Sequence, residues 1–137
     1  MKTIKINING KETEITLTKE QLKQINNQNS LQKVFDYHKT TEEEFNKLNS
    51  HLPKHLQGQI LEAMMVEMYN KGEKPNWSNS NQNKYYPYFN MGNFSYAGWN
   101  YHHASSRVPA SSIFIRKEDL LEAVELYIDL YKQSRTF

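Results

Sequence analysis

The hydrophobic pattern at the start of the chain predicts a β-hairpin. From Thr3 to Ile8, apolar and polar residues alternate with period two, and the alternation resumes from Glu12 to Leu17. Between these segments, Asn9-Gly10 supplies the two positions of positive φ that a tight hairpin turn requires. The beginning of the chain is therefore expected to form two antiparallel strands.

Helical spacing replaces this alternation after the hairpin. Thr18 and Gln21 have the spacing of a capping box, which predicts a short helix from Lys19 to about Ile25. The polar run 26–30 is expected to end that helix. A second short helix should follow, with its apolar positions at Leu31, Val34 and Phe35.

Two further helices are predicted in the first half of the chain. A threonine cap with three acids at 40–44 opens a helix that extends to Asn49. Pro53 stands at a first helical position, and Gly72 ends the following helix at about Lys71. Its apolar stripe, at spacings of three and four, consists of Leu56, Ile60, Leu61, Met64, Met65 and Met68. This stripe predicts a core helix.

The second half of the chain is aromatic and less regular. Residues 74–83 are expected to form a loop that contains Trp77. Strands are predicted at Lys84–Asn90, Asn93–Tyr101 and Ser112–Arg116, with the loop His102–Ala110 before the third strand. A helix from Lys117 through Tyr131 is predicted to follow. The tail 132–137 is expected to fray.

These elements predict an α+β fold in one domain, 1–137, with a hairpin and helices in 1–72 and an aromatic sheet and helix in 73–137. The order is an N-terminal β-hairpin, several helices, a small antiparallel aromatic-rich sheet and a C-terminal helix. With 137 residues and aromatics at 12%, the chain is large enough to bury a core.

Composition excludes several classes of function. The chain has no cysteine, which excludes disulfides and thiolate chemistry. A net charge of +2 is too small to indicate a nucleic-acid protein on its own. No signal peptide or membrane-spanning segment is visible, so the expected location is the cytoplasm, with no membrane partner.

Histidines and serines offer little chemistry. His51 and His55 are four residues apart, but Pro53 lies between them and no H-E-x-x-H pattern is present. The adjacent pair at 102–103 could supply a general base near the serines at 105–106, yet no acid lies nearby in the sequence to orient it. We therefore predict no catalytic residues, no metal site, no cofactor and no enzyme activity.

The aromatic stretch is the candidate site. Alternation along its first strand places Tyr86 and Tyr88 on one face. The predicted ligand-binding residues are Lys84, Tyr86, Tyr88, Tyr96, Trp99, Arg107 and Arg116. Such tyrosines could stack a base while the cations hold a phosphate, or they could form a protein-binding hot spot. Alternatively, the same aromatics build the core of the second half.

The second half also carries a motif pattern. Its parts are Lys74-Pro75-Asn76-Trp77-Ser78, Asn83 to Phe89, Phe94-Ser95-Tyr96, Ser106-Arg107 and Leu126 to Lys132. This order resembles uncharacterised small proteins of bacteriophages and bacterial mobile elements, which share a P-[DN]-W…KY-x-P-[WY]-F block and an S-R before a strand and a helix. The chain departs from that pattern at 108–111, which is inserted before the strand.

The resemblance implies a phage origin and a host bacterial cytoplasm. For a small domain without catalytic residues, it favours a non-enzymatic binding protein. One hypothesis is an anti-defence factor that sequesters a nucleotide or nucleic acid, or blocks a host bacterial immune protein. The alternative is a virion or assembly component that acts through protein–protein contacts, including contacts within a homo-oligomer.

Overall fold

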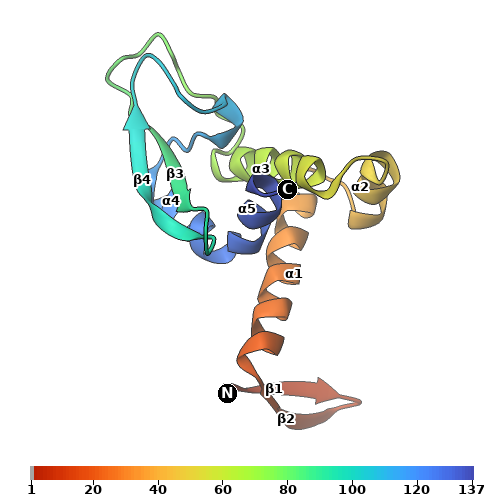
Figure 1. Ribbon diagram of the computed structural model, residues 1–137. Coiled ribbons are helices and arrows are strands. Elements are labelled where there is room, and N and C mark those ends of the chain that lie inside the picture. Colours follow the sequence, from red (N-terminus) through yellow and green to blue (C-terminus); the bar gives the residue numbers. More distant parts are fainter. Residues whose placement is uncertain (1) are drawn as a thin grey trace.

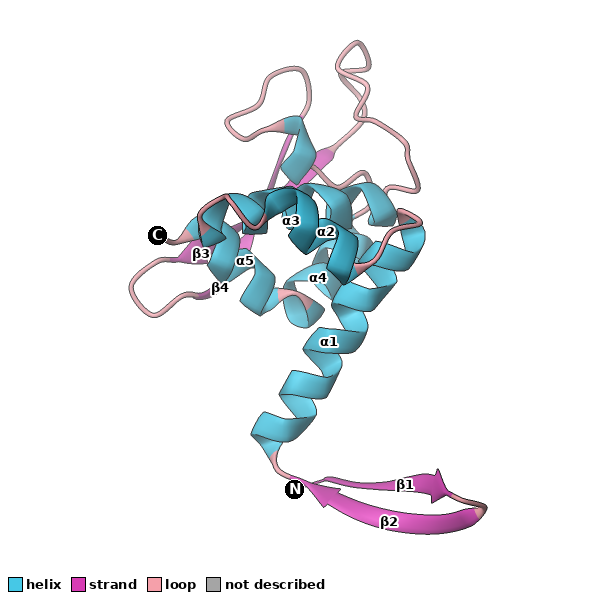
Figure 2. Ribbon diagram, turned by 90° about the vertical axis from the view of Figure 1, so that its right-hand side faces the viewer, coloured by secondary structure: helices cyan, strands magenta, loops and turns pink. Residues whose placement is uncertain are grey.

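The computed structural model describes residues 2–137 and shows a helical body that carries two separate hairpins (Figures 1 and 2). In chain order the elements are β1 Lys2–Ile8, β2 Lys11–Leu17, α1 Lys19–Tyr37, α2 Glu42–Asn49, α3 Lys54–Tyr69, β3 Lys84–Asn90, β4 Ser95–His102, the 3-10 turn η1 Ala110–Ser112, α4 Lys117–Leu126 and α5 Ile128–Arg135. The predicted α+β class and the order of hairpin, helices, aromatic sheet and terminal helix are confirmed.

The N-terminal hairpin forms as the alternation predicts. β1 pairs antiparallel with β2, and Ile4 lies opposite Ile15. Asn9 and Gly10 adopt φ values of 51° and 81°, the left-handed conformation that the turn needs. A bulky or β-branched residue at either position would strain this turn.

α1 is one continuous helix, so the prediction of two short helices is wrong. The capping box is present: the Gln21 N–H donates to the Thr18 Oγ at 3.1 Å, and the Thr18 N–H donates to the Gln21 Oε1 at 3.0 Å. The polar run 26–30 contains neither glycine nor proline, so nothing in it breaks the backbone pattern. Val34 and Phe35 are buried and anchor the far half of the helix.

The first part of the chain stands away from the body. Both views show α1 leaving the helical body and carrying the β1–β2 hairpin at its far end (Figures 1 and 2). The core and the side chains packed against it come from Leu31 onward. We call residues 2–29, the hairpin with the outer part of α1, the N-terminal arm.

α3 is the central helix of the body and packs along α5. At their crossing, a Cβ added to Gly58 would lie 2.8 Å from the backbone nitrogen of Ser134, so only glycine lets the two backbones approach this closely. The predicted helix is confirmed, and it ends where Lys71 and Gly72 adopt positive φ values of 55° and 77°.

The C-terminal region differs from the prediction in three ways. Residues 112–116 form no regular strand: η1 is followed by a single bridge from Phe114 to Tyr85. The last helix bends at Tyr127, where φ is −114° and ψ is 25°, which divides it into α4 and α5. The bend allows both halves to bury apolar residues. The predicted frayed tail is also wrong, because the helix continues to Arg135 and Ser134 is buried.

Candidate functional site

The register of β3 and β4 decides which aromatic side chains share a face. Opposite residues of an antiparallel pair point to the same side of the sheet. Pro87 lies opposite Trp99, and Tyr88 lies opposite Gly98. The register then shifts by one residue, because Ala97 is bulged out, and Phe89 lies opposite Tyr96.

This register separates the predicted ligand surface. One face, which we call the Tyr86 face, carries Lys84, Tyr86, Tyr88, Gly98, Asn100 and His102. The other, the Trp99 face, carries Tyr85, Pro87, Phe89, Tyr96, Trp99 and Tyr101. The four aromatics predicted to lie together are therefore divided in pairs: Tyr86 and Tyr88 lie on one face, and Tyr96 and Trp99 on the other.

The Tyr86 face is covered along most of its length. Lys84 is fully buried; its Nζ donates to the carbonyls of Asn79 and Gln82 at 3.1 and 2.9 Å and lies 5.3 Å from the Trp77 ring centroid. Lys84 thus holds the loop before β3 in place, and its charge is not at the surface. Its predicted role at the margin of a ligand surface does not fit this position.

Two residues of the Tyr86 face, Tyr88 and Asn100, are exposed to solvent. Tyr86 is 8% exposed, and its ring packs on His102 with 4.7 Å between centroids. Tyr88 is 49% exposed and lies across Gly98, where an added Cβ would come within 2.7 Å of the Tyr88 hydroxyl. A side chain at position 98 would displace this tyrosine.

The Trp99 face packs on the body at one end and is open at the other. Phe89 packs on Tyr131 with 4.9 Å between ring centroids and on Tyr96 with 6.5 Å. Burial and the nearby Tyr88 hydroxyl raise the pKa of Tyr96, so its ring stays neutral. This end, including Tyr96, is partly buried and packs against the core.

The open end forms a row of rings along β4, the aromatic ladder: Trp99, Tyr101 and His103. Their centroids are spaced by 6.4 and 5.3 Å, and Trp99 and Tyr101 are 36% and 44% exposed. The Lys117 Nζ, from the first turn of α4, lies 5.2 Å from the Trp99 ring centroid. Leu121, one turn further along α4, is exposed as well. Aromatic side chains displayed this way are typical of protein-binding hot spots.

Arg107 and Arg116, predicted to flank the ligand surface, have different environments. Arg107 is exposed in the loop after β4. The Arg116 guanidinium donates to the Asp119 carboxylate and to the Tyr69 carbonyl, both at 3.0 Å, and lies 4.0 Å from the Glu73 carboxylate. These contacts tie α3 to α4, so Arg116 has a structural role.

The outer edge of β4 is partly occupied, because the Tyr101 N–H donates to the Asn100 side-chain oxygen at 2.8 Å. On its inner side β4 pairs with β3, and the other edge of β3 bonds to Phe114 through two backbone hydrogen bonds of 2.9 and 2.7 Å with Tyr85. Within residues 2–137, no strand pairs with the outer edge of β4. The strand contains neither a charged residue nor a proline, the usual means by which proteins protect such an edge.

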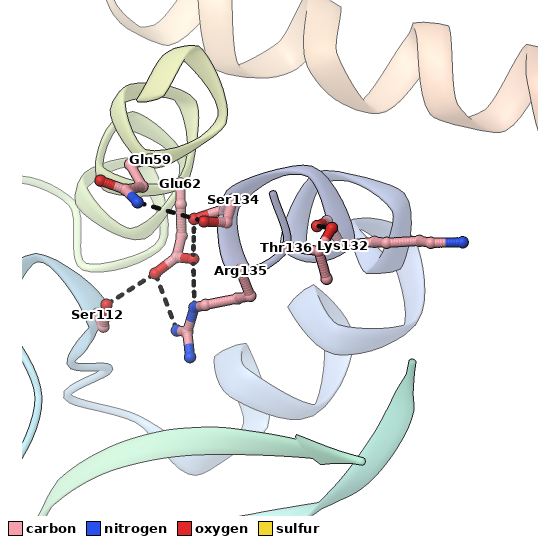
Figure 3. A network of polar contacts seen from close by, with 7 residues as sticks. All are labelled: Gln59, Glu62, Ser112, Lys132, Ser134, Arg135 and Thr136. Atoms are coloured by element: carbon pink, nitrogen blue, oxygen red, sulfur yellow. Dashed lines mark hydrogen bonds and ion pairs between the residues drawn. The ribbon is translucent and has the colours of Figure 1, made fainter. Parts of the chain in front are cut away.

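A second candidate for chemistry is a buried carboxylate, the Glu62 cluster (Figure 3). Glu62 is 5% exposed and accepts a bidentate pair of hydrogen bonds from the Arg135 guanidinium, both at 3.0 Å. Ser112 and Ser134 donate to it at 2.7 and 2.9 Å. Burial lowers the pKa of Arg135, but the hydrogen bond and charge of Glu62 outweigh this effect and raise it overall.

The Glu62 cluster acts as a structural tie. Each oxygen of Glu62 accepts two hydrogen bonds, one from a serine and one from Arg135, so the carboxylate is already satisfied and poorly suited to act as a general base. Its donors come from η1 and α5, so one side chain of α3 holds both segments. The arrangement explains why the C-terminal tail is ordered.

The adjacent pair His102 and His103 shows no catalytic arrangement. The His102 Nε2 lies 3.3 Å from the Tyr86 hydroxyl, and the His103 Nε2 lies 2.8 Å from the Asn83 side-chain oxygen. Neither contact supplies the acid that would orient a general base. Over residues 2–137, no group of three or more histidines and carboxylates could hold a metal ion.

Residues that sequence reasoning missed lie outside the motifs. Tyr101 alternates with Trp99 along β4, and this signal was available. Lys117 joins the ladder only through the packing of α4, and Glu62 and Arg135 are far apart in the sequence. No local pattern could have found these three residues.

Comparisons with known proteins add no family: no family model, curated protein or solved structure matches the chain. The resemblance to phage proteins therefore stays a prediction. Among the helices of residues 2–137, none combines the length and apolar character of a membrane crossing.

Proposed function

We propose that the protein is a non-enzymatic binding protein whose protein partner adds an extended segment to the outer edge of β4 and covers the aromatic ladder. The observation that carries this proposal is the uncharged, proline-free outer edge of β4 beside two exposed aromatic rings. An unprotected edge is a template for strand addition, in which main-chain hydrogen bonds supply affinity and alternate side chains supply specificity.

The bulge limits where the partner segment can bind. Ala97 interrupts the ladder of hydrogen bonds, so the regular edge extends from Gly98 to His102. Over this stretch Trp99 and Tyr101 project to one side, where alternate side chains of an added strand would meet them. Lys117, beside the Trp99 ring, gives this surface one positive charge.

The charges around the ladder favour a protein over a nucleotide or nucleic acid. Nucleic-acid affinity rests on cations that contact phosphates. Of the predicted cations, Lys84 is buried and Arg116 is engaged with acids, which leaves Arg107 exposed. The adjoining helix α4 carries exposed acids at Glu118, Glu122 and Glu125. A protein partner corresponds to the hypothesis of a factor that blocks a host immune protein, whereas the virion or assembly role remains its alternative.

The test uses tryptophan fluorescence, because the chain has only two tryptophans. In a Trp77→Phe variant, Trp99 becomes the sole reporter at the ladder. Peptides selected from a random display library on the immobilised protein should change its emission, and oligothymidylate, ATP and cyclic dinucleotides should not.

The matched variants are Tyr101→Ser in the ladder and Tyr88→Ser, which removes a similarly exposed tyrosine from the opposite face. We expect Tyr101→Ser to weaken peptide binding by about tenfold or more, as hot-spot residues do, and Tyr88→Ser to leave it unchanged. Quenching by the oligonucleotide or the nucleotides, without peptide binding, would overturn the proposal in favour of the nucleotide hypothesis.

A further inference from the structure

The hydrogen bonds of β3 determine which backbone groups of β4 face outward. The N–H and C=O of Tyr85 bond to Phe114 at 2.9 and 2.7 Å, on the side of β3 away from β4. Tyr101, which lies opposite Tyr85, therefore stands in a non-hydrogen-bonded pair and points its own N–H and C=O to the outer edge of β4. Trp99, two residues earlier and opposite Pro87, faces the same edge.

The Asn100 side chain occupies this edge at one of those two residues. The Tyr101 N–H donates to the Asn100 Oδ1 at 2.8 Å, within the range of a good hydrogen bond. Asn100 lies on the Tyr86 face and is exposed. Its amide therefore reaches the edge from the side opposite the aromatic ladder, and replacing it leaves both rings of Trp99 and Tyr101 in the chain.

We infer that Asn100 caps the outer edge of β4: in the free protein its amide oxygen occupies the Tyr101 N–H, and a partner segment binds when a main-chain carbonyl of that segment displaces the oxygen. This inference rests on the proposed function, in which a partner adds a strand at this edge. Proteins protect exposed edges with charges, prolines or bulges. From Gly98 to His102, beyond the bulge at Ala97, the side chain of Asn100 supplies this protection.

The cap is reversible, because it is one neutral hydrogen bond at an exposed position. The net stabilisation by such a bond corresponds to a factor of about 2 to 12 in an equilibrium constant. The Tyr101 N–H is thus open in about a tenth to a third of the molecules. A partner that covers the ladder with side chains alone gains nothing from displacing Asn100. The cap therefore selects an extended segment, whose main chain replaces the lost hydrogen bond, over other apolar surfaces.

Amide hydrogen exchange, followed by NMR on the full chain without any partner, tests the cap itself. Asn100→Ala removes the acceptor, so the protection of the Tyr101 N–H should fall by about twofold to tenfold. Asn100→Asp keeps an acceptor of the same shape, and a carboxylate accepts more strongly, so protection should not fall. The control is Asn90→Ala, which removes an exposed asparagine bonded to Ser95 in the same hairpin and should leave Tyr101 unchanged.

Binding to the selected library peptides, measured by Trp99 emission in the Trp77→Phe background, tests the consequence for a partner. Asn100→Ala should bind the peptides about twofold to tenfold more tightly than the parent, because the edge is always open. Asn100→Asp should bind them more weakly, and Asn90→Ala should match the parent. If Asn100 only packed against the partner, alanine would weaken binding, so the direction of the change identifies the cap.

The two measurements let this inference and the proposed function fail separately. Peptide binding that Asn100→Ala does not tighten, or a Tyr101 N–H whose protection is unchanged in that variant, overturns the inference and leaves the proposed function standing. If neither the parent nor Asn100→Ala binds any selected peptide, the proposed function is wrong and the inferred displacement by a partner is wrong with it. Each variant should keep the circular dichroism spectrum of the wild type, which excludes unfolding as the cause of weaker binding.

Discussion

Replacing Arg135 by methionine tests the Glu62 cluster. The substitution keeps a long apolar stem against the rings of Phe89 and Tyr131, whose centroids lie 5.5 and 5.6 Å from the guanidinium carbon. It removes both hydrogen bonds and the positive charge from Glu62, which is 5% exposed. The variant therefore isolates the cost of leaving a buried carboxylate without its counter-charge.

The magnitude follows from burial. Breaking a buried ion pair by removing one partner costs about 3–5 kcal/mol. The Arg135 side chain is 26% exposed, and Ser112 and Ser134 continue to donate to Glu62, so the lower end of that range applies. A loss of about 3 kcal/mol should lower the melting temperature of a chain of this size by about 10 °C.

The assay is urea unfolding at neutral pH, followed by circular dichroism. In the double variant with Glu62→Gln, the buried charge is gone, so it should be no less stable than Arg135→Met alone.

The control is Lys132→Met on the same helix, whose side chain points away from the cluster (Figure 3) and should change stability by less than about 0.5 kcal/mol. An Arg135→Met variant within that margin of the wild type would refute the reasoning.

The remaining predictions concern the packing of the body. Gly58→Ala should destabilise the fold by about 1–3 kcal/mol in thermal unfolding, because its Cβ would lie 2.8 Å from the Ser134 nitrogen. Tyr127→Phe should cost about 1 kcal/mol, because the Tyr127 hydroxyl donates to the Ser30 carbonyl at 2.7 Å. Tyr131→Phe should be neutral or stabilising, because no residue of the described chain bonds its buried hydroxyl. Burial raises the pKa of Tyr127 to about 12, so the wild type should lose stability as the pH rises from about 10 toward 12, and Tyr127→Phe should flatten that loss in denaturant titrations.

Elements with local start and stop signals could be predicted from the sequence. The Asn9-Gly10 turn, the cap at Thr41 and the glycine after α3 all lie where the pattern places them. The error at α1 has a physical cause: the polar run 26–30 lowers helix propensity, but burial of the distal half outweighs it. Intrinsic propensity gives way to packing when burial anchors one part of a continuous helix.

The tie between Glu62 and Arg135 could not be predicted, because the two residues are 73 positions apart and carry no shared motif. In the sequence, Glu62 is one acid within a helix, and Arg135 is one cation in a tail that composition predicts to fray. Only the crossing of α3 and α5 brings them together. The order of the C-terminus is thus a tertiary effect, and reasoning from local pattern underestimates it.

The composition of the aromatic face depends on a single residue. In the part of the hairpin nearest the turn, Phe89 pairs with Tyr96; if that register continued, Trp99 would lie opposite Tyr86 and would share its face, as the sequence suggested. The bulge at Ala97 shifts the pairing by one residue and moves Trp99 opposite Pro87. Such a one-residue slip turns every later side chain of a strand to the other face. Alternation therefore predicts which residues of a strand lie together only on one side of a bulge, and the bulge at Ala97 decides which residues of β3 share the face of Trp99 and Tyr101. Here it places the rings of β4 beside α4 and away from the loop of Trp77.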